Sequence, residues 1–405
     1  MTFTVGNLFY RPNSRLIRDL GVLALAVMHG ERSEPLRVLD AMSGTGVRSL
    51  RYSHETGGPV KVHSNELQFG DHPLSANLAP LVASGQCVVS NEDAVNLYMR
   101  AKLDGARYDL VDCDAFGTGQ PHTAEAWWAV SKGGMLYLCA TDSCTTDGHN
   151  PHKAASGYAA VAHRLPASNE QGLRLLLGAA WREAAARNLH AAPVFSYFHA
   201  PSSSFRVMLR LHKPKRPPAR AYESLAHVRR CVRCGQVWAV PSVDLCAARP
   251  ACACSACQQQ QQQQQQEEEV VEEESRPADQ VVGPMWVGPM HDVAFVRRMA
   301  AEAEAREWED AAELLATMAS EADAEAEGAL LFYHLGELQR QLQSAGLEQP
   351  SLSKLIPLLR AQGYGASHSH IEKKALKTSA TLKQVVDVVR QWQSDERAVV
   401  MDGDS

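Results

Sequence analysis

Long apolar runs are missing from this sequence, and so is the charged-then-apolar layout of a secretory signal at its start. No stretch reaches the roughly 18 consecutive apolar residues that a helix needs to span a bilayer. Aromatic residues are few at 6%, but the hydrophobic fraction of 45% and the charged fraction of 21% are typical of a globular protein. We therefore expect a soluble, intracellular protein that has no membrane partner.

An excess of positive charge is also missing, because the formal net charge is −6 at pH 7. Proteins that bind nucleic acids usually present clustered Lys and Arg side chains to the phosphates. The average hides an uneven distribution, since residues 213–233 are rich in Lys and Arg whereas residues 267–274 are mostly glutamate. The sequence thus allows one local basic surface, and it predicts that the acidic run is a solvated linker.

Disulfides are not expected, because the ten cysteines accompany no secretory signal. Six cysteines lie within residues 231–257, and two pairs among them have the Cys-x-x-Cys spacing that fits a tetrahedral Zn²⁺ ion. Cys246 or Cys252 could replace one ligand, and free thiols in a flexible segment are the alternative. The expected ligands of a structural zinc ion are Cys231, Cys234, Cys254 and Cys257.

The first half of the chain alternates short apolar, β-branched runs with helix-like stretches, which is typical of an α/β sheet with helices on both faces. Residues 193–211 then have the pattern of two strands joined by a short turn. Beyond residue 281 the pattern is mostly helical, and one alanine-rich helix is expected over 293–318. The other expected strands are 37–41, 60–64, 87–90, 108–113 and 134–140, and the other expected helices are 47–54, 72–84, 93–103 and 123–130.

A turn with two glycines follows the first expected strand, from Asp40 through Gly44 to Gly46. Glycines let a ligand approach the backbone, and the helix that follows offers free N–H groups. A dinucleotide site would need a third glycine where Ser49 stands, so a nicotinamide cofactor is disfavoured. In the loops after the next two strands, Glu66 suits the ribose hydroxyls, and Asp93 and Ala94 suit the amine and the ring edge of an adenine.

Asp114, Ala115 and Phe116 follow the fourth expected strand, at the edge where open α/β sheets bind ligands. A carboxylate and a neighbouring backbone carbonyl can free the lone pair of an exocyclic purine amine by accepting its hydrogens. An aromatic ring can hold a flipped base by stacking. An aspartate in a tight turn beside a core phenylalanine is the alternative. Together with the three preceding loops, the pattern favours methyl transfer to a purine amine.

These motifs, in this order, resemble the tRNA (guanine-26) N2-dimethyltransferases, the Trm1 family, over nearly the whole chain. The matching segments are FYRPNSRLIRDL, DAMSGTGVRSLRY, CDAFG, VSKGGMLYLCATD, GPMWVGPMHD and GYGASHSH with ALKTSA. The resemblance implies a class I, Rossmann-like methyltransferase sheet with an antiparallel terminal hairpin, followed by a smaller α+β C-terminal domain. It also implies S-adenosylmethionine as cofactor, tRNA as partner and the N2 amine of guanosine 26 as acceptor.

The resemblance also implies roles for individual residues. Arg18 and Arg48 would meet the methionine carboxylate, and Arg51 is the rival of Arg48 for this role. Ala115 stands where the family has Pro, which motivates an alternative function, a tRNA-binding or chaperone protein that has lost catalysis. Asp114, Ala115 and Phe116 would be catalytic, Phe9 would line the base pocket, and the cofactor would contact Asp40, Gly44, Gly46, Glu66, Asp93 and Ala94.

Four parts are expected along the chain, which we predict to be a monomer. The basic linker and Lys373, Lys374 and Lys377 near the end are expected to contact phosphates. The glutamine tract cannot bury a core and is expected to be disordered. The parts are a methyltransferase domain at 1–212, a basic linker with the zinc site at 213–257, a disordered insertion at 258–280 and a tRNA-binding domain at 281–395.

Overall fold

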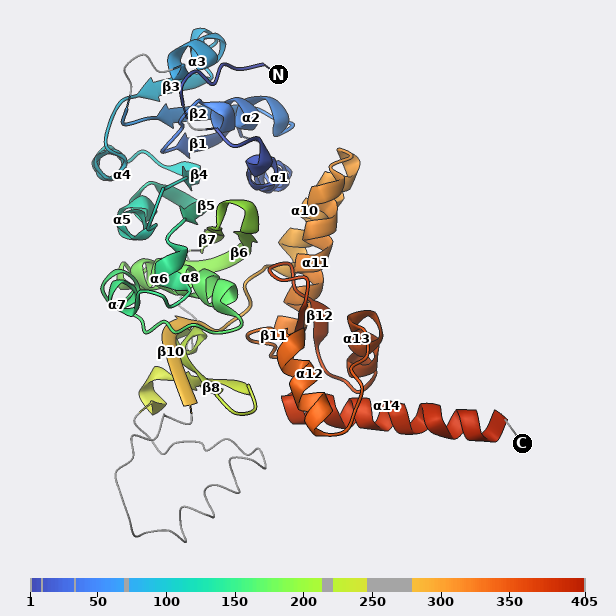
Figure 1. The fold of residues 1–405 in the computed structure, drawn as a ribbon. Helices are drawn as coiled ribbons and strands as arrows, with labels where there is room; N and C mark the ends of the chain where they lie inside the picture. Colours follow the sequence, from blue (N-terminus) through green and yellow to red (C-terminus); the bar gives the residue numbers. More distant parts are fainter. Residues whose placement is uncertain are drawn as a thin grey trace, which may run out of the picture. The chain divides into compact units, whose positions relative to one another are not determined.

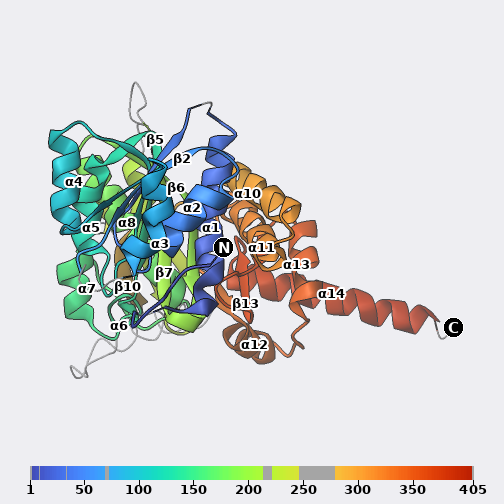
Figure 2. The same ribbon diagram turned by 90° about the horizontal axis from the view of Figure 1, so that it is seen from above.

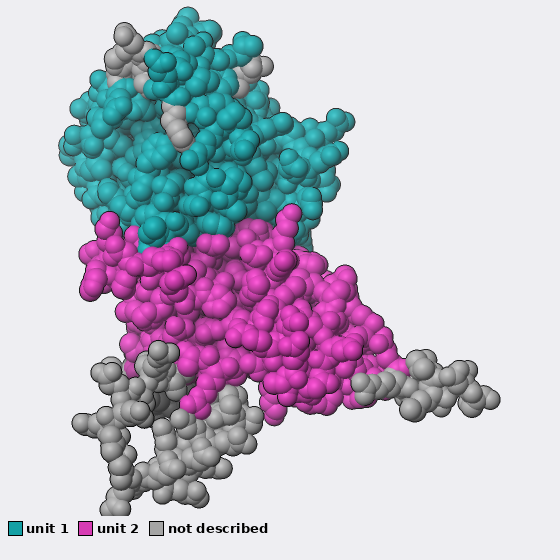
Figure 3. Space-filling view, viewed as in Figure 1, with its two compact units in different colours: residues 1–144, 176–219, 290–319 teal, residues 145–175, 220–289, 320–405 magenta. Residues whose placement is uncertain are grey.

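The computed structural model describes residues 2–8, 10–32, 34–68, 73–212, 221–245 and 279–403. The chain divides into two compact units, each built from three stretches that are distant in the sequence (Figure 3). Phe9, Cys254, Cys257 and the glutamine tract lie outside the described residues. Unit 1 comprises residues 1–144, 176–219 and 290–319, and unit 2 comprises residues 145–175, 220–289 and 320–405.

Unit 1 contains a seven-stranded sheet with the strand order β3-β2-β1-β4-β5-β7-β6 (Figure 1). Neighbouring strands among β1 to β5 are parallel, whereas β7 is antiparallel to both β5 and β6. The predicted class I sheet with an antiparallel terminal hairpin is therefore confirmed. Its strands are β1 (Leu36–Asp40), β2 (Val60–Asn65), β3 (Cys87–Ser90), β4 (Tyr108–Cys113), β5 (Val130–Ala140), β6 (His190–His199) and β7 (Ser204–His212).

Helices cover both faces of this sheet, as the alternating sequence pattern predicts. Figure 2 shows α1, α2 and α10 on one side of the sheet and α4 and α5 on the other. On the first side, Val38 and Tyr137 of the strands share an apolar core with Leu23 and Phe295 of the helices. The α-helices that lie wholly within unit 1 are α1 (Arg15–His29), α2 (Val47–Glu55), α3 (Leu74–Ala83), α4 (Ala94–Leu103), α5 (Gln120–Glu125) and α10 (Val293–Ala305).

The expectation of one helix over 293–318 is wrong, because α10 ends early and α11 (Glu309–Ala326) begins after a short turn. Glu307 in this turn has a φ of 57°, in the left-handed region that closes helix ends. The turn places the Trp308 ring against the rest of unit 1, with the Arg51 guanidinium 5.4 Å from its centre. Packing of one tryptophan thus accompanies the interruption of a sequence with high helix propensity.

Other differences concern the ends of elements and elements that the sequence did not indicate. The expected helix at 123–130 starts and ends earlier, as α5, and a short 3₁₀ turn leads from it into β5. Helix α1 was not expected, and neither were α6 (Ser143–Thr146), α7 (Pro151–Tyr158) and α8 (Ser168–Ala186). Across the described ranges, no helix combines the length and apolar character needed to cross a membrane.

Unit 2 contains two three-stranded antiparallel sheets, which confirms an α+β organisation for the C-terminal region. In one sheet β8 lies between β9 and β10, and in the other β13 lies between β11 and β12. Helices α12, α13 and α14 share an apolar core with the second sheet. The elements are β8 (Leu225–Cys231), β9 (Val237–Pro241), β10 (Asp279–Trp286), β11 (Tyr333–His334), β12 (Ala366–His368), β13 (Ala375–Thr378), α12 (Leu335–Ser344), α13 (Leu352–Ala361) and α14 (Leu382–Gly403).

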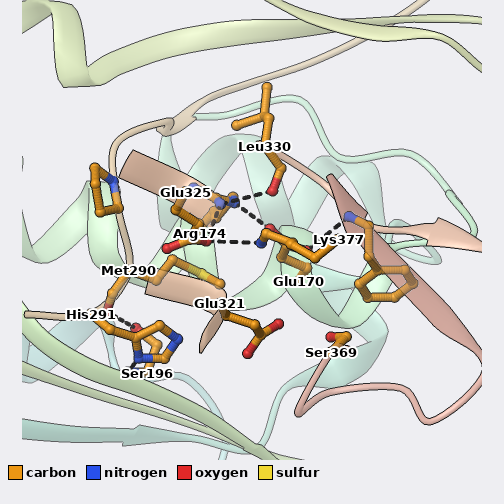
Figure 4. Close-up of polar contacts among 12 residues, drawn as sticks. Glu170, Arg174, Ser196, Met290, His291, Glu321, Glu325, Leu330, Ser369 and Lys377 are labelled. Carbon is orange, nitrogen blue, oxygen red and sulfur yellow. Dashed lines mark hydrogen bonds and ion pairs between the residues drawn. The ribbon is translucent and has the colours of Figure 1, made fainter. Parts of the chain in front are cut away.

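Four charged side chains form a buried cluster inside unit 2 (Figure 4). Glu170 and Arg174 of α8 form an ion pair, and Arg174 and Lys377 each approach Glu325 to 2.8 Å. None of the four side chains is more than 1% exposed. Lys377 therefore does not lie on the surface that its sequence context suggested, whereas the nearby Lys374 is exposed.

Candidate active site

A cavity of about 620 Å³ lies in unit 1 at the carboxyl ends of the parallel strands. The loops after β1, β2, β3 and β4 line it, together with residues of α1 and β7. The strand order reverses between β1 and β4, which is where open α/β sheets bind ligands. The predicted site residues on its wall are Arg18, Gly44, Arg48, Glu66, Asp93, Ala94, Asp114, Ala115 and Phe116.

Two glycines shape the loop after β1 in different ways. Gly44 has a φ of 53° and Gly46 a φ of 79°, so both adopt the left-handed region that favours glycine. A Cβ on Gly44 would meet nothing within 4 Å, because the backbone there faces open space. A Cβ on Gly46 would lie 2.8 Å from Leu74 Cδ1. Gly44 thus opens the cavity wall, whereas Gly46 permits the close packing of α2 against α3.

Asp40 lies behind the cavity wall. It ends β1, is fully buried and pairs in register with Asp112 of β4. Ser49 Oγ donates a hydrogen bond to its carboxylate over 2.7 Å. Burial, and secondarily the proximity of Asp112, raises the pKa of Asp40 to about 7. In this position Asp40 connects β1 to α2 without lining the cavity.

Arg18 of α1 is a buried cation on the cavity wall. Within the described chain its guanidinium donates to neutral oxygens, namely Tyr10 Oη at 3.2 Å and the carbonyls of Arg11 and Pro12 at 3.4 Å. Burial lowers the pKa of Arg18 to about 10, and the nearby positive charge of Arg48 acts in the same direction. An anion that entered this end of the cavity would stabilise the charge.

The Asp114 carboxylate is held by arginines from two elements. Arg48 of α2 contacts its Oδ2 at 2.9 Å, and Arg206 of β7 contacts its Oδ1 at 2.5 Å. Burial alone would raise the pKa of Asp114, but the Arg206 and Arg48 guanidiniums hold it well below its usual range. Asp114 is therefore an ionised, oriented hydrogen-bond acceptor on the cavity wall.

Arg48 differs from Arg18 because its charge is balanced inside the protein. Besides Asp114, it contacts Asp112 Oδ2 at 3.1 Å, and its side chain is 5% exposed. Arg51, the alternative to Arg48, pairs with Asp19 at 2.6 Å and is not part of the cavity wall. Among these three arginines, Arg18 has the charge that is most available to an anionic ligand.

The acidic residues after β2 and β3 lie on the wall as the sequence predicts. Glu66 Oε2 accepts a hydrogen bond from the Gly44 N–H over 2.9 Å, which ties two of the loops together. Asp93 caps α4 by accepting the N–H groups of Val95 and Asn96 through Oδ1. The cap uses one carboxylate oxygen, so Oδ2 can accept from a ligand. The ribose and adenine roles stay predictions.

Phe116 and Ala115 occupy contrasting environments after β4. The Phe116 side chain borders the cavity and is 78% exposed, which is high for a large apolar residue. Ala115 is buried at 4% exposure. An exposed ring at a cavity rim can stack on a planar ligand. The other aromatic prediction, Phe9, concerns a residue outside the described part of the chain.

The sequence did not indicate Arg206 and Asn65, which line the cavity, or Asp112, which contacts Arg48 behind the wall. Arg206 interrupts an apolar strand, and a charge within a buried strand indicates a buried partner. Asp112 lies in β4, two residues before Asp114 in the loop that follows. Asn65 ends β2, where its side-chain amide donates to the carbonyls of Ala41 and Glu92 and holds neighbouring loops together. The charge within β7 was the available signal, but its partner could not be identified without the fold.

Cys231 and Cys234 lie on a tight turn between β8 and β9. The Gly235 N–H donates to the Cys231 carbonyl over 2.9 Å, and the Cys231 N–H donates to the Gln236 carbonyl over 2.9 Å. Gly235 has a φ of 79°, so a glycine suits this turn. The other two predicted zinc ligands lie outside the described residues, and the zinc site stays a prediction.

Comparisons with known proteins identify the family of the chain. Residues 1–390 match the family described as N2,N2-dimethylguanosine tRNA methyltransferase. The chain is 28% identical over 292 residues to the tRNA (guanine(26)-N(2))-dimethyltransferase of Metallosphaera sedula, covering 72% of this chain and 66% of that protein. It is 25% identical over 385 residues to the enzyme of the same description from Methanothermobacter thermautotrophicus, covering 94% and 92%.

Among solved structures, the chain is similar to Trm1 from Pyrococcus horikoshii, which was solved in complex with S-adenosyl-L-methionine. The TM-score is 0.73 at 23% sequence identity, and the match covers 96% of this chain and 97% of the other. At this identity the likeness establishes the fold. It extends over both units, since almost the whole chain is covered.

Proposed function

Because the chain belongs to the N2,N2-dimethylguanosine tRNA methyltransferase family, we propose that it transfers methyl groups from S-adenosylmethionine to the N2 amine of guanosine 26 in tRNA. The observation that carries this proposal is the Asp114 carboxylate, which two arginines hold ionised on the cavity wall. A fixed carboxylate beside an exposed aromatic ring suits an exocyclic amine on a flipped base.

The chain's own residues fit the proposed cofactor. Gly44 leaves open space where a side chain would otherwise stand, and Arg18 offers a buried positive charge for the methionine carboxylate. Glu66, Asp93 and Ala94 line the same cavity. Glu66 and Asp93 would supply acceptors for the ribose hydroxyls and the adenine amine, and Ala94 would border the adenine. Bound there, S-adenosylmethionine would supply an electrophilic methyl group.

Asp114 would act on the acceptor as an orienting group. Its carboxylate would accept a hydrogen bond from one N–H of the guanine amine, and the carbonyl of Ala115 would accept one from the other, which orients the nitrogen lone pair for attack. Because its pKa is held low, Asp114 is poorly suited to retain a proton at neutral pH. Phe116 would hold the base by stacking at the rim.

Exposed basic residues in each of the two units would contact the tRNA backbone. Arg11 and Arg15 are exposed in unit 1, and Lys373 and Lys374 are exposed in unit 2. Such side chains neutralise phosphates without reading the sequence. Every described residue on the cavity wall comes from unit 1. The monomeric state stays a proposal.

The turn between β8 and β9 supports a structural zinc ion bound by Cys231, Cys234, Cys254 and Cys257. Metal analysis of the purified protein should then find zinc, and Cys234→Ser should lose it together with thermal stability. Cys144→Ser is the matched control, because Cys144 is an exposed cysteine outside the turn. Equal zinc content in wild type and Cys234→Ser would contradict this assignment.

The central test is mass spectrometry of nucleosides from unmodified tRNA treated with the purified protein and S-adenosylmethionine. We expect N2-methylated guanosine, formed at position 26, and we expect Asp114→Ala to reduce its yield by at least about 100-fold. The control variant is Arg210→Leu, which removes an arginine of β7 that pairs with Glu31 away from the cavity.

Two results would overturn the proposed function. Methylation of adenine or cytosine would reject the substrate. Wild-type transfer no greater than that of Asp114→Ala, with tRNA binding retained, would favour the alternative of a tRNA-binding protein that has lost catalysis. Binding of S-adenosylmethionine, measured by calorimetry on the same samples, separates a loss of chemistry from a loss of cofactor.

A further inference from the structure

The register of strands β4, β5 and β7 brings Arg206 close to Asp114. Cys113 at the end of β4 pairs with Leu138 of β5, and Cys139 of β5 pairs with Arg206 of β7. Arg206 and Asp114 are thus on opposite sides of β5 at the carboxyl edge of the sheet, and the long arginine side chain crosses that strand. Both residues line the same cavity.

The Arg206 guanidinium is only partly used by the protein. Its Nη2 donates to Asp114 Oδ1 over 2.5 Å, and its side chain is 6% exposed. The other two nitrogens, Nε and Nη1, are buried and have no acceptor within the described residues. Buried donors without acceptors are costly, so a guanidinium in this state is complementary to an acceptor that a ligand would bring.

Guanine presents a fixed order of groups along one edge, the N2 amine, then N1–H and then the O6 carbonyl. The first two donate hydrogen bonds and the third accepts one. Asp114 offers only acceptors, and Arg206 beside it offers only donors. The pair therefore has the order of acceptor and donor that complements this edge. Adenine has an amine in place of O6 and an unprotonated N1, so its edge would place donor against donor.

We propose that Arg206 is a specificity-determining residue that donates a hydrogen bond to O6 of the target guanine while Asp114 accepts from its amine. This inference rests on the proposed function. It assigns the choice of guanine to a pair of residues from β7 and the loop after β4. Arg48, on the opposite side of Asp114, is balanced by Asp112 and holds the carboxylate without reading the base.

The test compares two tRNA substrates that differ at position 26, one with guanine and one with 2-aminopurine, which keeps the amine but has neither O6 nor N1–H. The ratio of kcat/KM for the two is measured in wild type, Arg206→Leu, Arg206→Lys and the control Arg210→Leu. Each ratio comes from a single protein sample, so a change in the folded fraction cancels.

In wild type and Arg210→Leu, guanine should be preferred. Arg206→Leu should lose about 10- to 100-fold of that preference, the effect of one charge-assisted hydrogen bond, and Arg206→Lys should keep part of it. If Arg206→Leu lowers the rates for both substrates equally, Arg206 only positions Asp114 and the inference is rejected. If wild type transfers no methyl group to the guanine substrate, the proposed function itself has failed.

Discussion

Asp114 shows how a single residue takes its chemistry from neighbours on other elements. Burial and two guanidiniums act on it in opposite directions, and the guanidiniums prevail, so the pKa lies below its usual range. The charged groups around the carboxylate are Arg48 from α2, Arg206 from β7, Asp112 from β4 and, farther away, Arg18 from α1. The ionised form is retained as the pH falls, because the arginines remain protonated.

Removing one of these arginines should change the pH dependence of activity. In Arg206→Leu the pKa of Asp114 rises towards its ordinary value, so that activity falls on the acid side at a higher pH than in wild type. The measurement is kcat/KM between about pH 3 and about pH 7, which spans the ordinary pKa of an aspartate, with circular dichroism at each pH to verify folding. Parallel profiles for the two proteins would contradict this account of Asp114.

The pKa of Asp40 is raised, whereas that of Asp114 is lowered, and this should make the stability of the protein depend on pH. The pKa of Asp40 in the folded protein is raised to about 7, so the folded state binds a proton that the unfolded chain releases above about pH 4. Its contribution to stability is present at low pH and is lost as the pH rises through this interval. Asp40→Asn resembles the protonated acid and should flatten this part of the pH dependence of the urea midpoint. An unchanged pH dependence would show that Asp40 is ionised in the folded protein.

At the scale of elements, the loop after β1 makes opposite predictions for its two glycines. Gly46→Ala places a Cβ 2.8 Å from Leu74 in a left-handed conformation, and should destabilise the protein by more than about 1 kcal/mol. Gly44→Ala has space for the Cβ, so the cost is mainly backbone strain, but the methyl group enters the cavity. Urea unfolding should therefore show the larger loss of stability in Gly46→Ala. Calorimetry with S-adenosylmethionine should show the larger loss of cofactor affinity in Gly44→Ala.

The sequence predicted elements well where local pattern and packing coincide. The five parallel strands and the hairpin alternate with helices in a way that local periodicity shows, and the structure confirms them. Helix α1 was missed because residues 20–28 include no polar residue, so the apolar and polar alternation that marks an amphipathic helix is confined to its first turns. The break between α10 and α11 was missed because a glutamate in the left-handed region has no sequence signature.

The site was predictable to the extent that its residues follow strands. Glu66, Asp93 and Asp114 each lie in the loop that follows a strand, and the parallel sheet brings those loops to one edge. The partners of Asp114 were not predictable, because Arg206 is far away in the sequence and comes from the antiparallel hairpin. The difference between the two cofactor arginines, one balanced by carboxylates and one not, likewise depends on contacts between distant segments.

At the scale of the whole molecule, unit 2 is assembled from three separate stretches of chain, and one buried cluster contacts all of them. Arg174 comes from the first stretch, donates to the carbonyls of Trp286 and Gly288 in the second, and pairs with Glu325 in the third. Lys377 keeps its charge there, because although burial lowers its pKa, the carboxylates of the cluster raise it above the ordinary value. The cluster thus holds together three segments that are far apart in the sequence.

Arg174→Met should therefore destabilise the protein by about 3–5 kcal/mol, because it leaves buried carboxylates with one cation fewer. Lys354→Met is the control, since Lys354 pairs with Glu396 at the surface and exposed pairs contribute at most about 1 kcal/mol. Adding Glu325→Gln to Arg174→Met removes the excess negative charge and should recover part of the loss. Urea unfolding at neutral pH measures all three. If Arg174→Met costs no more than Lys354→Met, the cluster does not hold the three stretches of unit 2 together.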